Sequence, residues 1–404
     1  MTFDYRPLSD YADIKGGKRL PKDRNLIKTP NSHPYIRIRD LGKEKVLELT
    51  SDYEYVDDET QATIARYIVD TGDVIISIVG TIGLVAKVGN SLDKANLTEN
   101  CAKVTNIHGL NRDFLYYYLL SQHGQNAIKS ATVGAVQAKL PLKNIQALPM
   151  PDISLDEQRA IANILSALDT LIAQNKQINH HLVQIAQVLF KSWFESFDPW
   201  NGKFPETWTY TNLGNLCSLI AKGITPQYDE SSAEMVINQK CIRNKTIDLS
   251  LARRHKPKRI NEKWLQYGDV LINSTGEGTL GRVAQFFMGD GNITVDSHIT
   301  IVRPIEEQLV FFIGQWCLDR ECEFAKMASG STGQTDLPRE RLKTMECLLP
   351  DSLTLQKFSQ ILKPIVEMQV AAQKESVRLA TLRDTLLPRL MSGEQSIAQL
   401  DADK

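Results

Sequence analysis

The chain has 404 residues, 42% of them hydrophobic, and a formal net charge of −1, which is typical of a soluble protein of two to four domains. No apolar run approaches the roughly 18 residues of a membrane span, and the N-terminus lacks a secretory pattern, so we expect a cytoplasmic protein without membrane contact. The near-zero charge excludes a global basic field, so any contact with nucleic acid must come from local patches.

Residues 1 to about 150 predict a mixed α/β module built from short strands. Tyr35–Asp40 alternates apolar and charged residues, as a half-buried strand does. Asp73–Val79 predicts a buried strand, and Leu84–Val88 predicts a second strand after a glycine turn. Phe114–Leu120 predicts a helix that continues to about residue 130, and Gly134–Pro141 predicts a loop.

A long helix follows this module. Leu148–Asp152, with its two prolines, predicts a domain boundary, and Ser154 precedes an acidic first turn in the pattern of a capping box. The helix is expected to run to about Phe197, where Phe197–Pro205 forms a linker.

Apolar residues recur in this helix at alternating steps of three and four, which predicts a heptad seam against another helix. The seam consists of Ile161, Ile164, Leu168, Leu171, Asn175, Ile178, Leu182, Ile185 and Leu189. Adding 197 to each number gives a second seam of Phe358, Ile361, Ile365, Met368, Ala372, Glu375, Leu379, Leu382 and Leu386. Asn175 is expected to fix the register, and Pro364 predicts a kink or a late start of the second helix.

Other landmarks repeat in the same order, which indicates an internal duplication. Matched pairs include Gly72-Asp73-Val74 with Gly268-Asp269-Val270, and Gln137 with Gln334. The helices keep their register without insertion, whereas the modules share only a skeleton. Two modules with one skeleton and different side chains are suited to recognising two different targets.

Apolar residues remain outside the predicted seam, and we expect another protein to dock on them. They are Leu165, Ile172, Val188, Trp193 and Phe194.

No catalytic or metal-binding signature is present. The sequence lacks a phosphate loop, an HExxH zinc motif, a GxSxG elbow and an amino-methyltransferase motif. Gly276–Gly281 fits GxGxxG, but a strand is predicted after it, so a glycine-rich hairpin turn is expected rather than a dinucleotide site. The six cysteines are expected to be reduced thiols.

Basic clusters and amide-bearing loops in both modules make up the candidate DNA contacts. Lysine and arginine neutralise phosphates, arginine reads guanine and glutamine suits adenine. The candidates are Lys18, Arg19, Lys22, Arg37, Arg39, Gln137 and Lys139 in the first module, and Lys240, Arg243, Arg253, Arg254, Lys256, Lys258, Arg259, Gln334 and Thr335 in the second. For the basic clusters the alternative is a solvated charged loop, and for the glutamine loops it is a hydrogen-bonded turn.

Taken together, these features resemble the specificity subunit (HsdS) of type I restriction-modification systems. The resemblance covers the whole chain and is carried by the two Gly-Asp-Val strands and by four further segments. These are Leu148–Ala162, Leu189–Phe194, Phe204–Trp208 and Leu382–Gly393.

The resemblance implies an α+β fold with two target-recognition domains and two long antiparallel helices related by a pseudo-twofold axis. The expected segments are domain 1 at 1–152, a central helix at 153–197, domain 2 at 198–350, a C-terminal helix at 351–395 and a tail at 396–404. Each domain would read half of a bipartite DNA site, and the helices would act as a ruler. The 29-residue seam spans roughly 43 Å, or about 13 base pairs.

The resemblance also implies that the chain itself is not an enzyme. Two modification subunits would bring S-adenosylmethionine, and restriction subunits would bring ATP and Mg²⁺, so this chain would hold no cofactor. Two alternatives remain open from the sequence: a self-contained methyltransferase or nuclease with cryptic motifs, and a pure coiled-coil scaffold.

Overall fold

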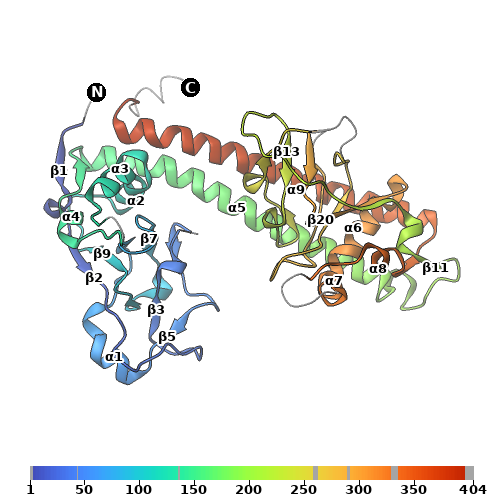
Figure 1. Ribbon diagram of the computed structural model, residues 1–404, viewed down its shortest axis with the longest axis horizontal. Helices are drawn as coiled ribbons and strands as arrows, with labels where there is room; N and C mark the ends of the chain where they lie inside the picture. The colour runs from blue at the N-terminus through green and yellow to red at the C-terminus, as the bar shows by residue number, and fades with distance from the viewer. Residues whose placement is uncertain are drawn as a thin grey trace. The chain divides into compact units, whose positions relative to one another are not determined.

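The computed structural model describes residues 3–42, 44–134, 137–257, 263–288, 292–328 and 335–395. The chain divides into two units, residues 1–172 with 377–404, and residues 173–376. Each unit holds one α+β module together with part of two long helices, α5 (Leu155–Phe194) and α9 (Ser352–Ser392) (Figure 1). Among the described residues, none of the helices is long and apolar enough to span a membrane.

The first module contains three sheets, with strand orders β2-β9-β6-β7-β4, β5-β3-β8 and β1-β10. The strands are β1 (Tyr5–Pro7), β2 (Asp13–Gly16), β3 (Pro34–Ile36), β4 (Val46–Leu47), β5 (Glu54–Tyr55), β6 (Val74–Ser77), β7 (Val85–Val88), β8 (Asn96–Leu97), β9 (Cys101–Thr105) and β10 (Pro149–Pro151). The helices are α1 (Asp58–Ile64), α2 (Arg112–Leu120), α3 (Gln122–Ala131) and α4 (Leu142–Gln146), with 3-10 turns that include η2 (Ile38–Asp40).

The second module has strand orders β12-β20-β17-β18, β16-β13-β19, β14-β15 and β11-β21. The strands are β11 (Thr209–Asn212), β12 (Cys217–Lys222), β13 (Met235–Ile237), β14 (Ile242–Arg243), β15 (Thr246–Ile247), β16 (Arg253–Arg254), β17 (Val270–Asn273), β18 (Val283–Gln285), β19 (Ile293–Val295), β20 (Ile299–Pro304) and β21 (Glu346–Leu349). The helices are α6 (Val310–Asp319), α7 (Glu321–Met327) and α8 (Arg339–Lys343), with 3-10 turns that include η7 (Gln239–Cys241).

The two modules share one topology, which confirms the duplication. In each larger sheet, the strand that comes first in the chain (β2 or β12) pairs with the strand that comes last (β9 or β20). That last strand also pairs with the hairpin β6-β7 or β17-β18. In each smaller sheet one pair is parallel, with Tyr35 opposite Asn96 in the first module and Met235 opposite Ile293 in the second. The glycine-rich segment after β17 leads into the antiparallel strand β18, so it is the expected hairpin turn.

The repeated Gly-Asp-Val motif begins the central strand of each module. Gly72 and Gly268 have φ angles of 83° and 90°, the left-handed region that glycine adopts without strain. Asp269 is fully buried, and both of its carboxylate oxygens lie 2.7 Å from the guanidinium of Arg303. In the first module, a carboxylate oxygen of Asp73 lies 3.2 Å from the ammonium nitrogen of Lys103. A buried ion pair therefore holds the turn against the neighbouring strand.

The aspartate also caps the turn that precedes it. The backbone N–H of Gln266 donates to Asp269 at 2.8 Å, and the N–H of Asp70 donates to Asp73 at 3.0 Å. These bonds satisfy donors that the turn would otherwise leave unpaired. Together with the ion pair, these bonds explain why a buried position carries an aspartate in both halves.

Several local predictions were wrong at their ends. The strand expected at Tyr35–Asp40 stops at Ile36, because the chain turns into η2. The helix expected from Phe114 to about residue 130 breaks at Ser121, which ends α2 and caps α3 through its hydroxyl.

The long helices also differ in detail from the prediction. Ser154 caps α5 as expected, with the N–H of Glu157 3.2 Å from its hydroxyl, and α5 ends at Phe194 rather than near residue 197. α9 begins at Ser352 and continues through Pro364, so a late start was wrong. Pro364 is exposed, where one missing backbone hydrogen bond is tolerated.

Within each unit the two helices run antiparallel. In the first unit, Arg383 of α9 pairs with Asp169 of α5 at 2.8 Å. In the second unit, Asn175 donates to Glu375 at 3.0 Å, and the rings of Phe194 and Phe358 have centroids 4.8 Å apart. Partner residue numbers fall on one helix as they rise on the other, which defines the direction.

The predicted seam was wrong by one residue at alternate positions, from Leu171 to Ile185 on α5 and from Ile361 to Leu382 on α9, whereas Ile164 is half-buried. Leu171, Ile178 and Ile185 are 45%, 43% and 47% exposed. The buried or half-buried positions lie one residue later and are Leu165, Ile172, Asn179 and Ala186 on α5, and Leu362, Gln369, Ser376 and Arg383 on α9. Ile161, Leu168, Asn175 and Leu182 are buried as predicted.

Packing on the modules explains this shift. In the first unit, Ile161 and Leu165 join a core that includes Phe114 and Leu390. In the second unit, Phe190 and Phe194 join the module core together with other residues, which are Ala186, Phe312, Leu355, Phe358, Leu362 and Val366. Each helix has to cover a module and a partner helix, so its buried stripe is centred between these two neighbours rather than on the partner helix alone.

Of the residues expected to remain free for another protein, Leu165 and Phe194 are therefore buried and Ile172 and Trp193 are half-buried. Val188 alone among those five is largely exposed, at 66%.

Candidate nucleic-acid interface

In both modules, loops from separate parts of the sequence meet at one end of the larger sheet. In the first module, the N–H of Leu140 donates to Ile78 at 2.9 Å, which brings the segment after Val133 beside the end of β6. In the second module, the N–H of Leu337 donates to the carbonyl oxygen of Ser274 at 2.9 Å, which brings the segment that begins at residue 335 beside the end of β17. The same sheet end therefore carries an equivalent loop in each module.

A glycine makes this sheet end possible in both modules. A Cβ on Gly17 would lie 2.0 Å from the carbonyl oxygen of Thr98, and a Cβ on Gly223 would lie 2.1 Å from that of Val295. Neither position can hold a larger residue without moving backbone. The end of β2 or β12 thus packs directly on the loop that precedes β9 or β20.

The first module places four predicted DNA contacts at this end. Lys18 and Arg19 are exposed directly after Gly17, and Gln137 and Lys139 are exposed on the loop before Leu140. Val133 and Lys139 exchange backbone hydrogen bonds of 2.8 and 2.9 Å, so these two residues of the loop are paired. Lys22 is also exposed, farther along the first loop.

Arg37 and Arg39 are engaged elsewhere in the module. Both guanidinium groups contact the carboxylate of Glu54, and Arg39 also donates to the carbonyl oxygen of Asp52 at 3.1 Å. They were predicted to share one face of a strand. Arg37 instead follows the last residue of β3, and Arg39 lies in η2.

The second module displays its arginine-rich segment on the edge strand β16. The guanidinium carbon of Arg253 lies 3.5 Å from the ring centroid of Tyr228, and Arg254 donates to the carbonyl oxygen of Ser232 at 2.6 Å. Lys256 is exposed beside them. The stacked tyrosine restricts Arg253 to few rotamers while leaving its charge accessible.

The remaining predicted contacts of the second module are separate from this edge. Lys240 is exposed in η7, Arg243 is exposed on the β14–β15 hairpin, and Thr335 is exposed on the loop before Leu337. Lys258, Arg259 and Gln334 lie outside the described residues.

The sequence analysis missed three polar residues at the sheet end of the second module, Lys222, Thr275 and His298, and they meet there with Asp336 of the predicted glutamine loop. The ammonium group of Lys222 lies 2.7 and 2.6 Å from the two carboxylate oxygens of Asp336. The hydroxyl of Thr275 lies 2.7 Å from Nδ1 of His298. Thr275 and Asp336 form a backbone bridge, so the two pairs are adjacent. They are far apart in sequence, and only the fold brings them together.

A network of charged groups joins the first module to the long helices. The ammonium group of Lys45 lies 2.8 Å from Asp113, 2.7 Å from the hydroxyl of Ser166 on α5, and 3.1 Å from the hydroxyl of Tyr117. Lys87 also contacts Asp113 at 2.7 Å. One carboxylate thus holds two lysines where module and helix meet.

The network continues through Tyr117 to both helices. Tyr117 donates to Asp169 of α5 at 2.5 Å, and Asp169 accepts from Arg383 of α9 at 2.8 Å. Burial lowers the pKa of Lys45. Burial alone would raise the pKa of Asp113, but hydrogen bonds from the two lysines outweigh burial, and the pKa falls. Both shifts follow from an ion pair held in a partly desolvated joint.

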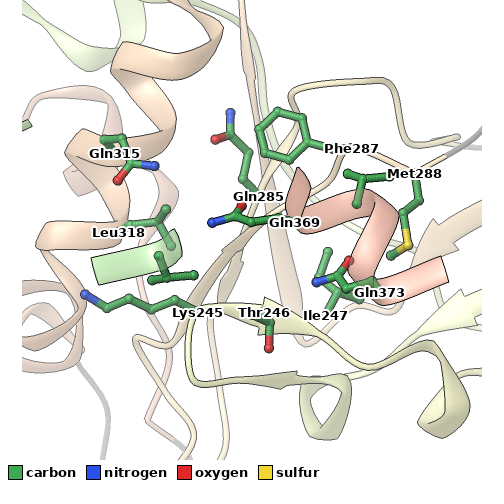
Figure 2. Close-up of a pocket in the computed structure, with 12 residues that line it drawn as sticks. Lys245, Thr246, Ile247, Gln285, Phe287, Met288, Gln315, Leu318, Gln369 and Gln373 are labelled. Atoms are coloured by element: carbon green, nitrogen blue, oxygen red, sulfur yellow. The ribbon is translucent and has the colours of Figure 1, made fainter. Parts of the chain in front are cut away.

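The corresponding joint in the second unit is lined by amides. Gln285 and Gln315 stand 198 residues after Lys87 and Tyr117. They line a cavity of about 40 Å³ together with Lys245, Gln369 and other residues, which are Val183, Thr246, Ile247, Phe287, Met288, Leu318, Val370 and Gln373 (Figure 2). The cavity has room for one or two water molecules. The positions equivalent to Lys87 and Tyr117 therefore carry amides beside a small cavity in the second unit.

The misplaced seam residues form an exposed apolar strip on each long helix. On α5 the strip consists of Leu171, Ile178 and Ile185, and on α9 it consists of Ile361, Met368 and Leu382. Leu171 and Met368, like Ile185 and Leu382, are 197 residues apart, so equivalent positions are exposed on both helices.

The repeated modules and paired helices define an internally duplicated protein that presents two versions of one loop-bearing sheet end. Among the described residues, no three His, Cys, Asp or Glu side chains are grouped so as to hold a metal ion. A family model described as the type I restriction modification DNA specificity domain matches residues 2–184. Residues 2–184, which comprise the first module and most of α5, are therefore assigned to this DNA specificity domain.

Individual relatives agree with this assignment over most of the chain. The specificity subunit of the type I restriction enzyme MjaIX of Methanocaldococcus jannaschii is 24% identical over 98% of this chain and 94% of its own length. The specificity subunit of the type I restriction enzyme HindI of Haemophilus influenzae is 22% identical over 70% of this chain and 77% of its own. Neither relative supports the alternative of a self-contained methyltransferase or nuclease.

The fold also has a counterpart among solved structures. The crystal structure of the S subunit of a type I restriction-modification system from M. genitalium superposes with a TM-score of 0.58, covering 97% of this chain and 96% of that chain at 16% identity. At this identity the similarity concerns the fold.

Proposed function

We propose that this chain is the DNA sequence-specificity subunit of a type I restriction-modification complex, and that each module reads one half of a bipartite, asymmetric site. The observation that carries this proposal is the repetition of one sheet end with different side chains. Lys139 in the first module and Asp336 in the second occupy the same backbone position, bridged to Val79 and to Thr275. Opposite charges at one position suit different base sequences.

The long helices would set the spacing between the half-sites. Each is continuous over 40 or 41 residues, and their residues pair in a fixed antiparallel register. A rigid spacer of defined length restricts which separations of two half-sites can be bound together.

Catalysis would belong to the partner subunits. In this proposal the chain binds no cofactor of its own and acts in the cytoplasm. The modification subunits supply S-adenosylmethionine-dependent adenine methylation, and the restriction subunits supply ATP- and Mg²⁺-dependent translocation and cleavage.

Mapping methylated adenines in the host genome, with and without this gene, tests the proposal. We expect one split motif to lose methylation when the gene is deleted and to regain it on complementation. Complementation with a chain whose residues 1–152 come from another specificity subunit is the informative comparison. One half of the motif should change and the other half should stay the same.

Two results would refute this function. A methylome unchanged by the deletion favours a scaffold without DNA preference. A change in both halves after exchange of one module contradicts the assignment of one half-site to each module.

We also propose that two modification subunits dock on the two exposed apolar strips. Ile178 and Ile185 are 43% and 47% exposed and belong to none of the buried clusters that the described residues form. Exposed aliphatic residues in register along a helix are typical of a surface that another protein covers. Equivalent strips on α5 and α9 provide two similar surfaces, which matches two copies of one partner.

Replacing Ile178 and Ile185 together by aspartate should weaken association with the modification subunit at least tenfold, because two charges would be buried at the interface. Co-purification and analytical ultracentrifugation measure this association. The matched control is Lys176→Asp with Gln184→Asp, two exposed polar positions on the same helix, which should leave association nearly unchanged. Equal losses in both double variants would contradict docking through the strip.

A further inference from the structure

We propose that Lys222, Thr275, His298 and Asp336 form the base-reading set of the second module, in which Lys222 and His298 contact base edges in the major groove and Asp336 and Thr275 hold them in position. This inference rests on the proposed function and adds the residues that determine one half-site. It comes from comparing the two modules position by position.

The comparison is anchored by shared backbone hydrogen bonds. The N–H of Ile78 donates to Asn100 at 2.8 Å in the first module, and the N–H of Ser274 donates to His298 at 2.8 Å in the second. Asn100 and His298 therefore occupy one position directly before the last strand of the larger sheet. The backbone is kept at this position while the side chain differs.

The other members differ in the same way. The bridged pair is Val79 with Lys139 in the first module and Thr275 with Asp336 in the second. The first strand of the larger sheet ends at Gly16 in one module and at Lys222 in the other. All four positions thus share a backbone frame and carry different chemistry, as expected where two modules read different bases.

His298 is exposed and held in one orientation. Its Nδ1 is bonded to the hydroxyl of Thr275, and its backbone N–H donates to Asp296 at 2.9 Å. Among the residues that the structure describes, no hydrogen bond is made by Nε2, so this nitrogen can meet a ligand. A side chain that is already ordered loses little conformational entropy on binding.

The side chain of Lys222 is also held in one position before DNA binds. Its ammonium group has three donors, and the two carboxylate oxygens of Asp336 take up part of this capacity at 2.7 and 2.6 Å. The carboxylate fixes the position of the ammonium group and offsets its charge, which disfavours a purely electrostatic contact with phosphate. Donors aimed in this way suit the N7 and O6 acceptors of guanine.

The test uses the full chain bound to its modification subunit and a DNA library in which the second half-site is randomised. His298→Ala should lower affinity for the preferred sequence about tenfold or more. It should also relax selection at one or two base pairs of that half-site only. Lys256→Ala, which removes a charge on β16, should instead weaken all sequences equally and reduce the slope of log affinity against log salt by about 0.9.

Positioning is tested separately at Thr275. Thr275→Val removes the hydroxyl that orients His298 and should relax the same base pairs as His298→Ala. Thr275→Ser keeps the hydroxyl and should retain wild-type selection. Thermal unfolding of each variant, followed by tryptophan fluorescence, should match that of the wild type, because His298 is exposed and Thr275→Val is nearly isosteric.

Two outcomes overturn this inference alone: a His298→Ala chain that selects the wild-type sequence, or one that loses affinity equally for all sequences. A wild-type complex that selects no split site overturns the proposed function as well. The wild-type arm therefore separates the two failures.

Discussion

Replacing Asp269 by alanine is expected to lower the free energy of unfolding of the second unit by about 3–5 kcal/mol, because the change leaves Arg303 charged and without its carboxylate partner. Asp269 is fully buried, and Arg303 reaches it with two bonds of 2.7 Å. The same substitution also removes the acceptor for the N–H of Gln266. Few surface substitutions approach this effect.

Denaturant unfolding followed by tryptophan fluorescence measures this loss selectively. All five tryptophans lie in the second unit and are Trp193, Trp200, Trp208, Trp264 and Trp316. The control is Glu340→Ala, which removes an exposed carboxylate paired with Lys343 in its own helix and should change stability by about 0.5 kcal/mol or less.

A double replacement separates the charge effect from the loss of packing. Asp269→Leu with Arg303→Met should recover part of the stability that Asp269→Ala loses, because no unpaired charge remains. A loss below about 1 kcal/mol in Asp269→Ala would refute the role assigned to the buried pair.

Replacing Leu182 by aspartate should destabilise the helix pair by about 3–5 kcal/mol, whereas Ile185→Asp on the same helix should cost about 0.5 kcal/mol or less. The two residues are three positions apart and both were predicted to lie in the seam. Leu182 is 8% exposed and Ile185 is 47% exposed. Burial of a carboxylate is costly only where water cannot reach it.

Urea unfolding monitored by far-ultraviolet circular dichroism compares these two variants. A third variant, Ala186→Asp, should resemble Leu182→Asp, because Ala186 is 1% exposed and occupies the position that replaces Ile185 in the observed seam. If Ile185→Asp were as destabilising as Leu182→Asp, the seam predicted from the sequence would be right and the observed one wrong.

The difference between the predicted and observed seams shows what periodicity can establish. On α5 apolar residues occupy three positions of most heptads, one more than a two-helix seam needs, whereas on α9 the third position is polar at Gln369, Ser376 and Arg383. Periodicity identifies this set of positions. It does not distinguish those that pack on the partner helix or the module, such as Leu165, from those left for another protein, such as Ile178.

The candidate DNA contacts also fall into two groups, those that the structure leaves exposed and those that it pairs with a carboxylate. Composition located Arg253 and Arg254, because clustered basic residues are visible in the sequence, and both are exposed. The same reasoning selected Arg37 and Arg39, although both are paired with the carboxylate of Glu54. A local charge pattern cannot include a carboxylate that the fold delivers from another strand.

By itself the sequence determined the family resemblance, the α+β class, the duplication and the two long helices. These follow from periodicity, from motif order and from glycine and proline positions, all of which are local or repeat at a fixed offset. Only the tertiary structure decided which helix positions are buried, how the first module is held through Lys45 and Asp169, and which polar groups meet at the sheet ends. His298 and Thr275, or Lys222 and Asp336, become neighbours only when strands distant in the chain pair, and no local pattern in the sequence records that pairing.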